Sequence, residues 1–267
     1  MTCSAWPAAR RGLAATAVLL TVVAVPAGAQ RGPAPEKTNL PSEVLSVVCA
    51  PKIAFELPDR SMRVTGGQDS APRYAWGPGD LITINAGENN GIEIGQQYFV
   101  RRVQVENGQK VSRITPASVA TVGWLKVWAI EKDMSLATIV HACDSMEIGD
   151  YLEPFVMPTV VKPRAEILKP ERDNYARIMF GTDQRRSFGK GEYFIIDRGV
   201  DLGIEPGDRF VVYRDRRLFE NFMYSLGDAV AIEVNEETAT LQVTVSRDAF
   251  MAGDYVAVRR LPVNSTK

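Results

Sequence analysis

An internal duplication constrains this fold more than any other feature of the sequence. Residues 77–102 lie over residues 189–214 at a constant offset of 112, without gaps, and the match places glycine on glycine and aliphatic residue on aliphatic residue. A chain that repeats one pattern must bury the same apolar positions twice, so we expect two copies of one structural module.

A second matched block extends the repeat toward the end of each copy. At an offset of 104, Gly123 lies over Gly227 and residues 149–151 lie over residues 253–255. The offset falls because the middle of the first copy is eight residues longer, and that extra length contains Asn107-Gly108. This dipeptide is a strong signal for a two-residue β-hairpin turn.

The repeated segments predict short β-strands. Residues 81–84 and 193–196 are β-branched, aliphatic or aromatic and are bounded by turn residues, and residues 98–100 and 210–213 have the same character. A module of five or six such strands over about 75–90 residues has the size of a small barrel, whose own side chains fill its interior. The predicted fold class is therefore all-β, with two tandem small β-barrels of SH3-like type and no deep pocket.

Glycines at fixed spacing mark the turns of both copies. We expect these glycines to permit turns with positive φ. Repeated Gly-Asp pairs predict tight turns, with metal ligation by the aspartates as the alternative. The predicted turn glycines are Gly87, Gly91, Gly95, Gly149, Gly199, Gly203, Gly207 and Gly253, and the pairs are Gly79-Asp80, Gly149-Asp150, Gly207-Asp208 and Gly253-Asp254.

The N-terminal 29 residues have the pattern of a Sec-type signal peptide. Arg10 and Arg11 precede an apolar stretch over residues 13–25, and small residues at 27 and 29 predict cleavage after Ala29. An uncleaved anchor is the alternative, and the arginine pair admits a twin-arginine signal. The apolar stretch is short for a bilayer-spanning helix and no second one follows, so we expect a periplasmic or secreted mature protein that does not span the membrane.

The same patterns divide the chain into segments. The expected divisions are a signal peptide at 1–29, an extended Pro-rich N-terminal segment at 30–60, a first β-barrel module at 61–154, a Pro-rich linker at 155–174, a second β-barrel module at 175–261 and a tail at 262–267.

Two cysteines remain once the signal peptide is removed. In an oxidising compartment, Cys49 and Cys143 predict a disulfide that ties the N-terminal segment to the first module. It would close a loop of roughly 95 residues and, in the chain-entropy model, stabilise the fold by up to about 4–5 kcal/mol. Two unrelated buried thiols are the alternative.

The motif Ile84-Asn85-Ala86-Gly87-x-x-x-Gly91-Ile92-x-x-Gly95, followed by a strand, a hairpin and Gly149-Asp150-Tyr151, resembles the C-terminal domain of flagellar assembly protein T. Similar sequence patterns occur in the β-domain of the rod-shape protein MreC and in secreted proteins, some of which are assigned LysM modules. The resemblance covers both modules and implies a small β-barrel. It carries no functional residues, and the other domains of the flagellar protein have no counterpart here.

The residues that catalysis or cofactor binding would need are largely missing. The single histidine, His141, aligns with Val245 in the second copy, which favours an ordinary strand position. No nucleophile elbow, phosphate loop or zinc-ligand pattern occurs, so we expect no enzyme, no metal and no cofactor. A formal net charge of −1 argues against a nucleic-acid partner.

Contact surfaces are the remaining functional signal. Trp124 aligns with Asp228, which predicts an exposed aromatic, with partial burial under the long first hairpin as the alternative. Trp76, Arg101 and Arg102 are further candidate contacts, whereas Trp128 aligns with Ile232 and is expected in the core.

Three hypotheses follow for function. The first is a structural or interaction protein of the cell envelope that docks a protein partner through its paired barrels. The second is a peptidoglycan or envelope-glycan binding module that stacks sugars on tryptophan. The third is an envelope hydrolase with dispersed carboxylates.

Overall fold

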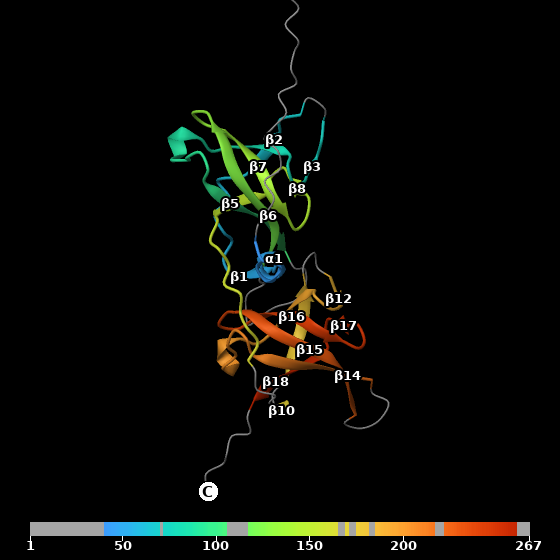
Figure 1. Cartoon of the computed structure of the whole chain (residues 1–267). Helices are drawn as coiled ribbons and strands as arrows, with labels where there is room; N and C mark the ends of the chain where they lie inside the picture. The colour runs from blue at the N-terminus through green and yellow to red at the C-terminus, as the bar shows by residue number, and fades with distance from the viewer. Residues whose placement is uncertain are drawn as a thin grey trace, which may run out of the picture. The chain divides into compact units, whose positions relative to one another are not determined.

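A computed structural model describes residues 40–69, 72–105, 117–164, 169–170, 175–181, 185–216 and 222–260. This part of the chain is nearly all β, with one short α-helix, α1 (Ser42–Val48), so the predicted fold class is confirmed (Figure 1). None of its helices is long and apolar enough to cross a membrane. The signal peptide at 1–29, the hairpin at 107–108 and the tail at 262–267 lie outside the described residues.

The first barrel is a closed, antiparallel sheet of six strands. In spatial order they are β2 (Val64–Gly67), β4 (Leu81–Ile84), β7 (Ser135–Ala142), β6 (Ala117–Ile130), β5 (Gln97–Val105) and β9 (Tyr151–Pro154). The last strand returns to the first, because Arg63 bridges Tyr151 and the Val64 amide donates to the Asp150 carbonyl at 2.8 Å. Closure leaves the six strands without a free edge.

The second barrel repeats this order strand for strand. Its strands are β11 (Ala176–Gly181), β13 (Tyr193–Ile196), β16 (Ala239–Ser246), β15 (Met223–Val234), β14 (Arg209–Asp215) and β18 (Tyr255–Arg260). Strand β18 pairs with both β14 and β11 and closes the barrel. The duplication seen in the sequence is therefore a duplication of one complete barrel.

Shorter elements also correspond between the copies. They are β3 (Ala75–Trp76) paired with β8 (Met146–Glu147), β12 (Ser187–Phe188) paired with β17 (Phe250–Met251), and the 3-10 helices η1 (Glu88–Asn90) and η3 (Val200–Leu202). Two strands are additions outside the repeat: β1 (Lys52–Ala54) pairs with β6, and β10 (Lys169–Pro170) pairs with β18.

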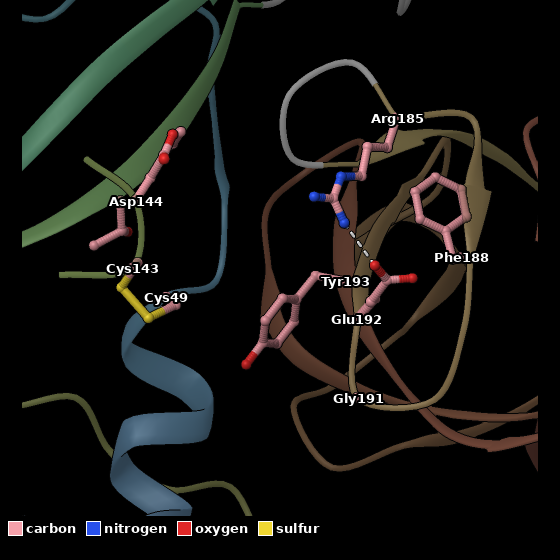
Figure 2. Close-up of a pocket in the computed structure, with 10 residues that line it drawn as sticks. Cys49, Cys143, Asp144, Arg185, Phe188, Gly191, Glu192 and Tyr193 are labelled. Atoms are coloured by element: carbon pink, nitrogen blue, oxygen red, sulfur yellow. Dashed lines mark hydrogen bonds and ion pairs between the residues drawn. A yellow bond between two sulfur atoms is a disulfide. The ribbon is translucent and has the colours of Figure 1, made fainter. Parts of the chain in front are cut away.

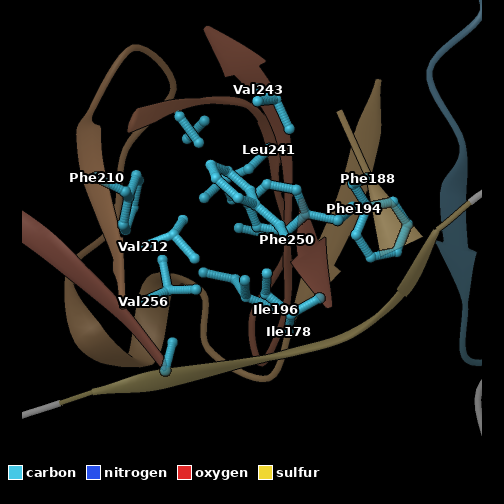
Figure 3. Close-up of a cluster of buried hydrophobic side chains, with 14 of the residues drawn as sticks. Ile178, Phe188, Phe194, Ile196, Phe210, Val212, Leu241, Val243, Phe250 and Val256 are labelled. Atoms are coloured by element: carbon cyan, nitrogen blue, oxygen red, sulfur yellow. The ribbon is translucent and has the colours of Figure 1, made fainter. Parts of the chain in front are cut away.

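Each barrel fills its interior with its own side chains. In the core of the second barrel the ring of Phe194 packs against those of Phe188 and Phe250, with centroids 5.8 Å apart in each pair (Figure 3). Leu125 and Ile139 are among the aliphatic residues that fill the first interior. These residues alternate with outward-facing ones along the strands, as the period of two requires.

The N-terminal segment, predicted to be extended over 30–60, contains a helix, so that prediction is wrong at residues 42–48. Residues 42–48 form α1 and residues 52–54 form β1. A helix of seven residues is unstable by itself in water, and it forms here because Leu45 and Val48 pack on the outer wall of the first barrel.

The Gly-Asp pairs are tight turns, as predicted. In all four the glycine has a φ between 87° and 96°, and the aspartate accepts a hydrogen bond from the amide three residues earlier. Gly87 and Gly199 correct the prediction of positive φ, because theirs are −142° and −144°. Each is required instead by close backbone approach, since a Cβ would lie 2.2 Å from the Glu131 carbonyl oxygen or 2.0 Å from that of Asn235.

This difference predicts unequal costs for two alanine substitutions in the second barrel. Gly199→Ala forces a methyl group into backbone and should lower the free energy of unfolding by about 3 kcal/mol or more. Gly253→Ala meets open space and should cost only about 1–2 kcal/mol, the penalty of its left-handed conformation. Urea denaturation of both variants measures the two costs, and equal costs would contradict the assignment.

Candidate functional site

A disulfide fixes helix α1 to the first barrel. Cys49 follows the helix directly and is bonded to Cys143, which follows β7, with the two Cα atoms 5.6 Å apart (Figure 2). The prediction of this pair is confirmed, and the alternative of two separate thiols is excluded in this structure. The bond joins residues 94 apart in sequence and holds α1 against the outer wall.

Trp124 lies beneath this helix, so the prediction that it is exposed is wrong. Its side chain is 1% exposed and packs with Val48 and Phe99. Its ring lies 4.7 Å from that of His141 and 5.5 Å from that of Phe155. The aligned Asp228 is a poor guide because no counterpart of α1 occurs among the described residues of the second copy.

Trp76 is also buried, at 3% exposed, which corrects its assignment as a surface contact. It belongs to the core of the first barrel, and Gly67 makes room for it because a Cβ there would lie 2.2 Å from the indole nitrogen. The sequence held a signal for this. At the offset of 112, Trp76 falls on Phe188, which fills the same place in the second barrel.

Trp128 shows the opposite error, since it was expected in the core and is 48% exposed. Leu125 and Val127 lie in the barrel core, so the period of two along β6 places Trp128 on the outward face. Ile232 likewise follows the core residue Ala231 and is only half-buried. Trp128 is therefore the most exposed tryptophan among the described residues.

Arg102 holds two parts of the barrel together and is not a free surface contact, so that assignment is wrong. Its guanidinium is already bonded within the protein. It donates to both carboxylate oxygens of Asp150, at 2.8 and 2.9 Å, and to the Ser145 carbonyl. In the second barrel Arg214 makes the same contacts with Asp254 and the Ala249 carbonyl. Each clamp joins β5 or β14 to the turn before the closing strand of the same barrel, β9 or β18.

Arg101 is buried as well, at 2% exposed, and is likewise corrected. Its guanidinium donates to Thr121 and, at 3.2 Å, to Glu153, and it lies 4.3 Å from the centre of the Phe99 ring. Desolvation lowers the pKa of Arg101, and the negative charge of Glu153 opposes that shift. Neither Arg101 nor Arg102 is free to bind an anionic polymer.

His141 lies in β7, as its alignment predicted, but the fold places it beside both cysteines. Its Nε2 is 3.9 Å from the Cys49 sulfur, and the three potential ligand atoms lie within 4.8 Å of one another. Sequence reasoning missed this cluster because Cys49 is remote in sequence, although the His-x-Cys spacing of 141 and 143 was visible. With the cysteines bonded, no thiolate is available to hold a metal.

A cavity of 270 Å³ lies beside the disulfide (Figure 2). Its charged side chains are already paired, because Arg185 binds Glu192 at 2.6 Å and Asp144 lies 3.6 Å from Arg102. Burial raises the pKa of Tyr193 to about 12, so this phenol stays protonated at neutral pH. The lining therefore offers polar contacts and no activated nucleophile.

Comparison with known proteins adds no family. No protein-family model matches the chain, and no curated protein matches it. The resemblance to flagellar assembly protein T therefore stays a prediction that rests on the repeated motif alone.

Reduction of the disulfide should release α1 and uncover Trp124. We expect the Cys49→Ser/Cys143→Ser variant to lose about 2–5 kcal/mol of unfolding free energy, since the long loop is no longer closed. Its tryptophan emission should shift to longer wavelength, and a Trp124→Phe background should lack that shift. An unchanged stability together with an unchanged spectrum would contradict the role of the bond.

The environment of His141 predicts a pH dependence of stability. Desolvation lowers the pKa of His141 below its ordinary 6.5, so the unfolded chain binds this proton more tightly than the folded one. The contribution to stability is complete above pH 6.5 and is lost as the pH falls through the lowered pKa.

The His141→Val variant carries valine, as the second barrel does at the aligned Val245, and it removes the pH-dependent contribution of His141 to stability. Between pH 7.5 and 5, the oxidised wild-type protein should lose more unfolding free energy than the variant does, as measured by urea denaturation at each pH. Parallel losses in the two proteins would show that His141 does not contribute.

Proposed function

We propose that this chain is a non-enzymatic protein of the cell envelope that docks a protein partner on the outer walls of its two barrels. The observation that supports this most directly is that both walls already bind segments of the chain itself. On the first barrel, α1 covers Phe99 and Trp124. On the second, Ile53 packs with Phe180 and Ile195, and Thr240 donates to the Pro51 carbonyl at 3.2 Å.

Packed interiors also favour contacts at the outer wall. A barrel whose centre is filled by its own side chains has no internal room for a substrate or cofactor. Its surface must then carry recognition, and exposed apolar side chains mark such surfaces. A periplasmic or secreted location fits the disulfide, which persists in oxidising compartments.

An exposed apolar patch on the first barrel is the surface to test, and it comprises Ile94, Trp128 and Met134. Ile94 and Trp128 are on neighbouring backbone segments, because the Gly95 amide donates to the Val127 carbonyl, and Met134 lies at the turn between β6 and β7. The wall formed by Thr65 and Thr83 is the matched control. Its hydroxyls bond each other at 3.0 Å, and it presents polar groups to solvent.

A photo-crosslinking amino acid placed at Ile94 or Trp128 should capture a defined protein in living cells, and the same group at Thr65 should not. The adduct should resist muramidase, and the complex should re-form from the purified components. The glycan hypothesis has lost its expected platforms, because Trp76 and Trp124 are buried. It would replace the docking proposal if the purified protein sedimented with peptidoglycan sacculi and crosslinked to no protein.

A further inference from the structure

The second barrel has an open groove where the first barrel holds α1. The first-barrel wall under the helix includes Phe99, Trp124, Val140 and Phe155. In the second barrel a groove of 390 Å³ is lined by the counterparts of Trp124, Val140 and Phe155, which are Asp228, Thr244 and Arg259. Arg209, Val230 and Val245 also line it, and Pro163 of the linker borders it.

The correspondence rests on strand register as well as on sequence. In the first barrel Trp124 pairs with Phe99 on one side and with His141 on the other. In the second barrel Asp228 pairs with Val211 and with Val245 in the same way. The two sites therefore correspond in strand register: α1 covers the site in the first copy, and the described residues leave a groove bordered by Pro163 in the second.

Charge distinguishes the two copies of the site. The stack of Trp124 on Phe155 is replaced by an ion pair between Asp228 and Arg259, whose atoms lie 2.6 Å apart. Arg209 stands where the first barrel has Gln97, lines the groove, and has no hydrogen-bond or ion-pair partner among the described residues. The groove thus has an apolar floor, two arginines and one aspartate.

The terminal nitrogens of an unpaired guanidinium can donate charge-assisted hydrogen bonds to a carboxylate, and these are among the stronger hydrogen bonds in proteins. The floor formed by Val230 and Val245 offers the apolar contact that a helix face needs. The occupant of the site in the first barrel is itself a short helix with an apolar face.

We propose that the groove of the second barrel binds a short amphipathic helix of the partner protein, with an acidic side chain of that helix accepting a hydrogen bond from Arg209. This rests on the proposed docking function and specifies one of its surfaces and the chemistry of the partner. The apolar floor and the precedent of α1 favour a helix over a free anion.

The test uses a display library of cysteine-free 12-residue peptides, selected on the whole mature, oxidised protein. Enriched peptides should carry apolar residues at helical spacing and at least one Asp or Glu. Measured by fluorescence anisotropy, the affinity of Arg209→Gln for an enriched peptide should be about tenfold or more lower than that of the wild type, as expected for loss of a charge-assisted hydrogen bond. Arg198→Gln is the matched control, since Arg198 lies on the same barrel but outside the groove, and it should leave binding unchanged.

A charge exchange separates recognition from a general effect on folding. Arg209→Glu should abolish binding of the acidic peptide and restore binding of the same peptide with lysine in place of its acid. Enriched peptides without an acidic preference, no enrichment, or equal binding by Arg209→Gln would overturn the proposal. The proposal would also be overturned if the protein formed a dimer, or sedimented with sacculi, and Arg209→Gln but not Arg198→Gln abolished that association. Crosslinking at Ile94 and Trp128 reports independently on whether the chain docks a protein at all.

Discussion

Closure of each barrel by its last strand is the interaction on which the rest of the structure depends. Strand β9 pairs with β5 and returns to the start of β2, and strand β18 pairs with β14 and returns to β11. The Arg102–Asp150 and Arg214–Asp254 clamps hold the turn that delivers this strand. A carboxylate that is buried with a bidentate arginine and a backbone amide is well satisfied, so the closing turn has one favoured geometry.

Each interior is filled by side chains at equivalent positions, and the two copies differ most in what covers their outer walls. The first barrel carries α1 over an aromatic wall, and the disulfide retains the helix there. The second barrel carries Met179, Phe180 and Ile195 on a wall where the first has threonine and glycine, and Ile53 covers them. Duplication thus supplied one stable scaffold twice, and substitution of outward-facing residues gave each copy its own contacts.

Sequence reasoning reached the barrels, the repeat and the tight turns because each depends on local or periodic signals. It reached the disulfide because only two cysteines remain after the signal peptide. Alternating apolar residues and turn glycines define strands wherever they occur. Candidate contacts fared worse. Trp124 was assigned from its repeat partner Asp228, an inference that fails when a segment outside the repeat covers one copy only. Trp128 was assigned from Ile232, although alternation with the core residue Val127 places it on the outward face.

The sequence by itself determined that one β-module occurs twice, that its core positions are aliphatic and aromatic, and that two cysteines were available to pair. These properties follow from spacing and composition along the chain. Only the tertiary structure decided which outward-facing residues are covered, because α1 and β1 reach their walls from a segment without a repeat partner. For the same reason it alone showed that the place occupied by α1 in the first barrel is an open groove lined by Arg209 in the second.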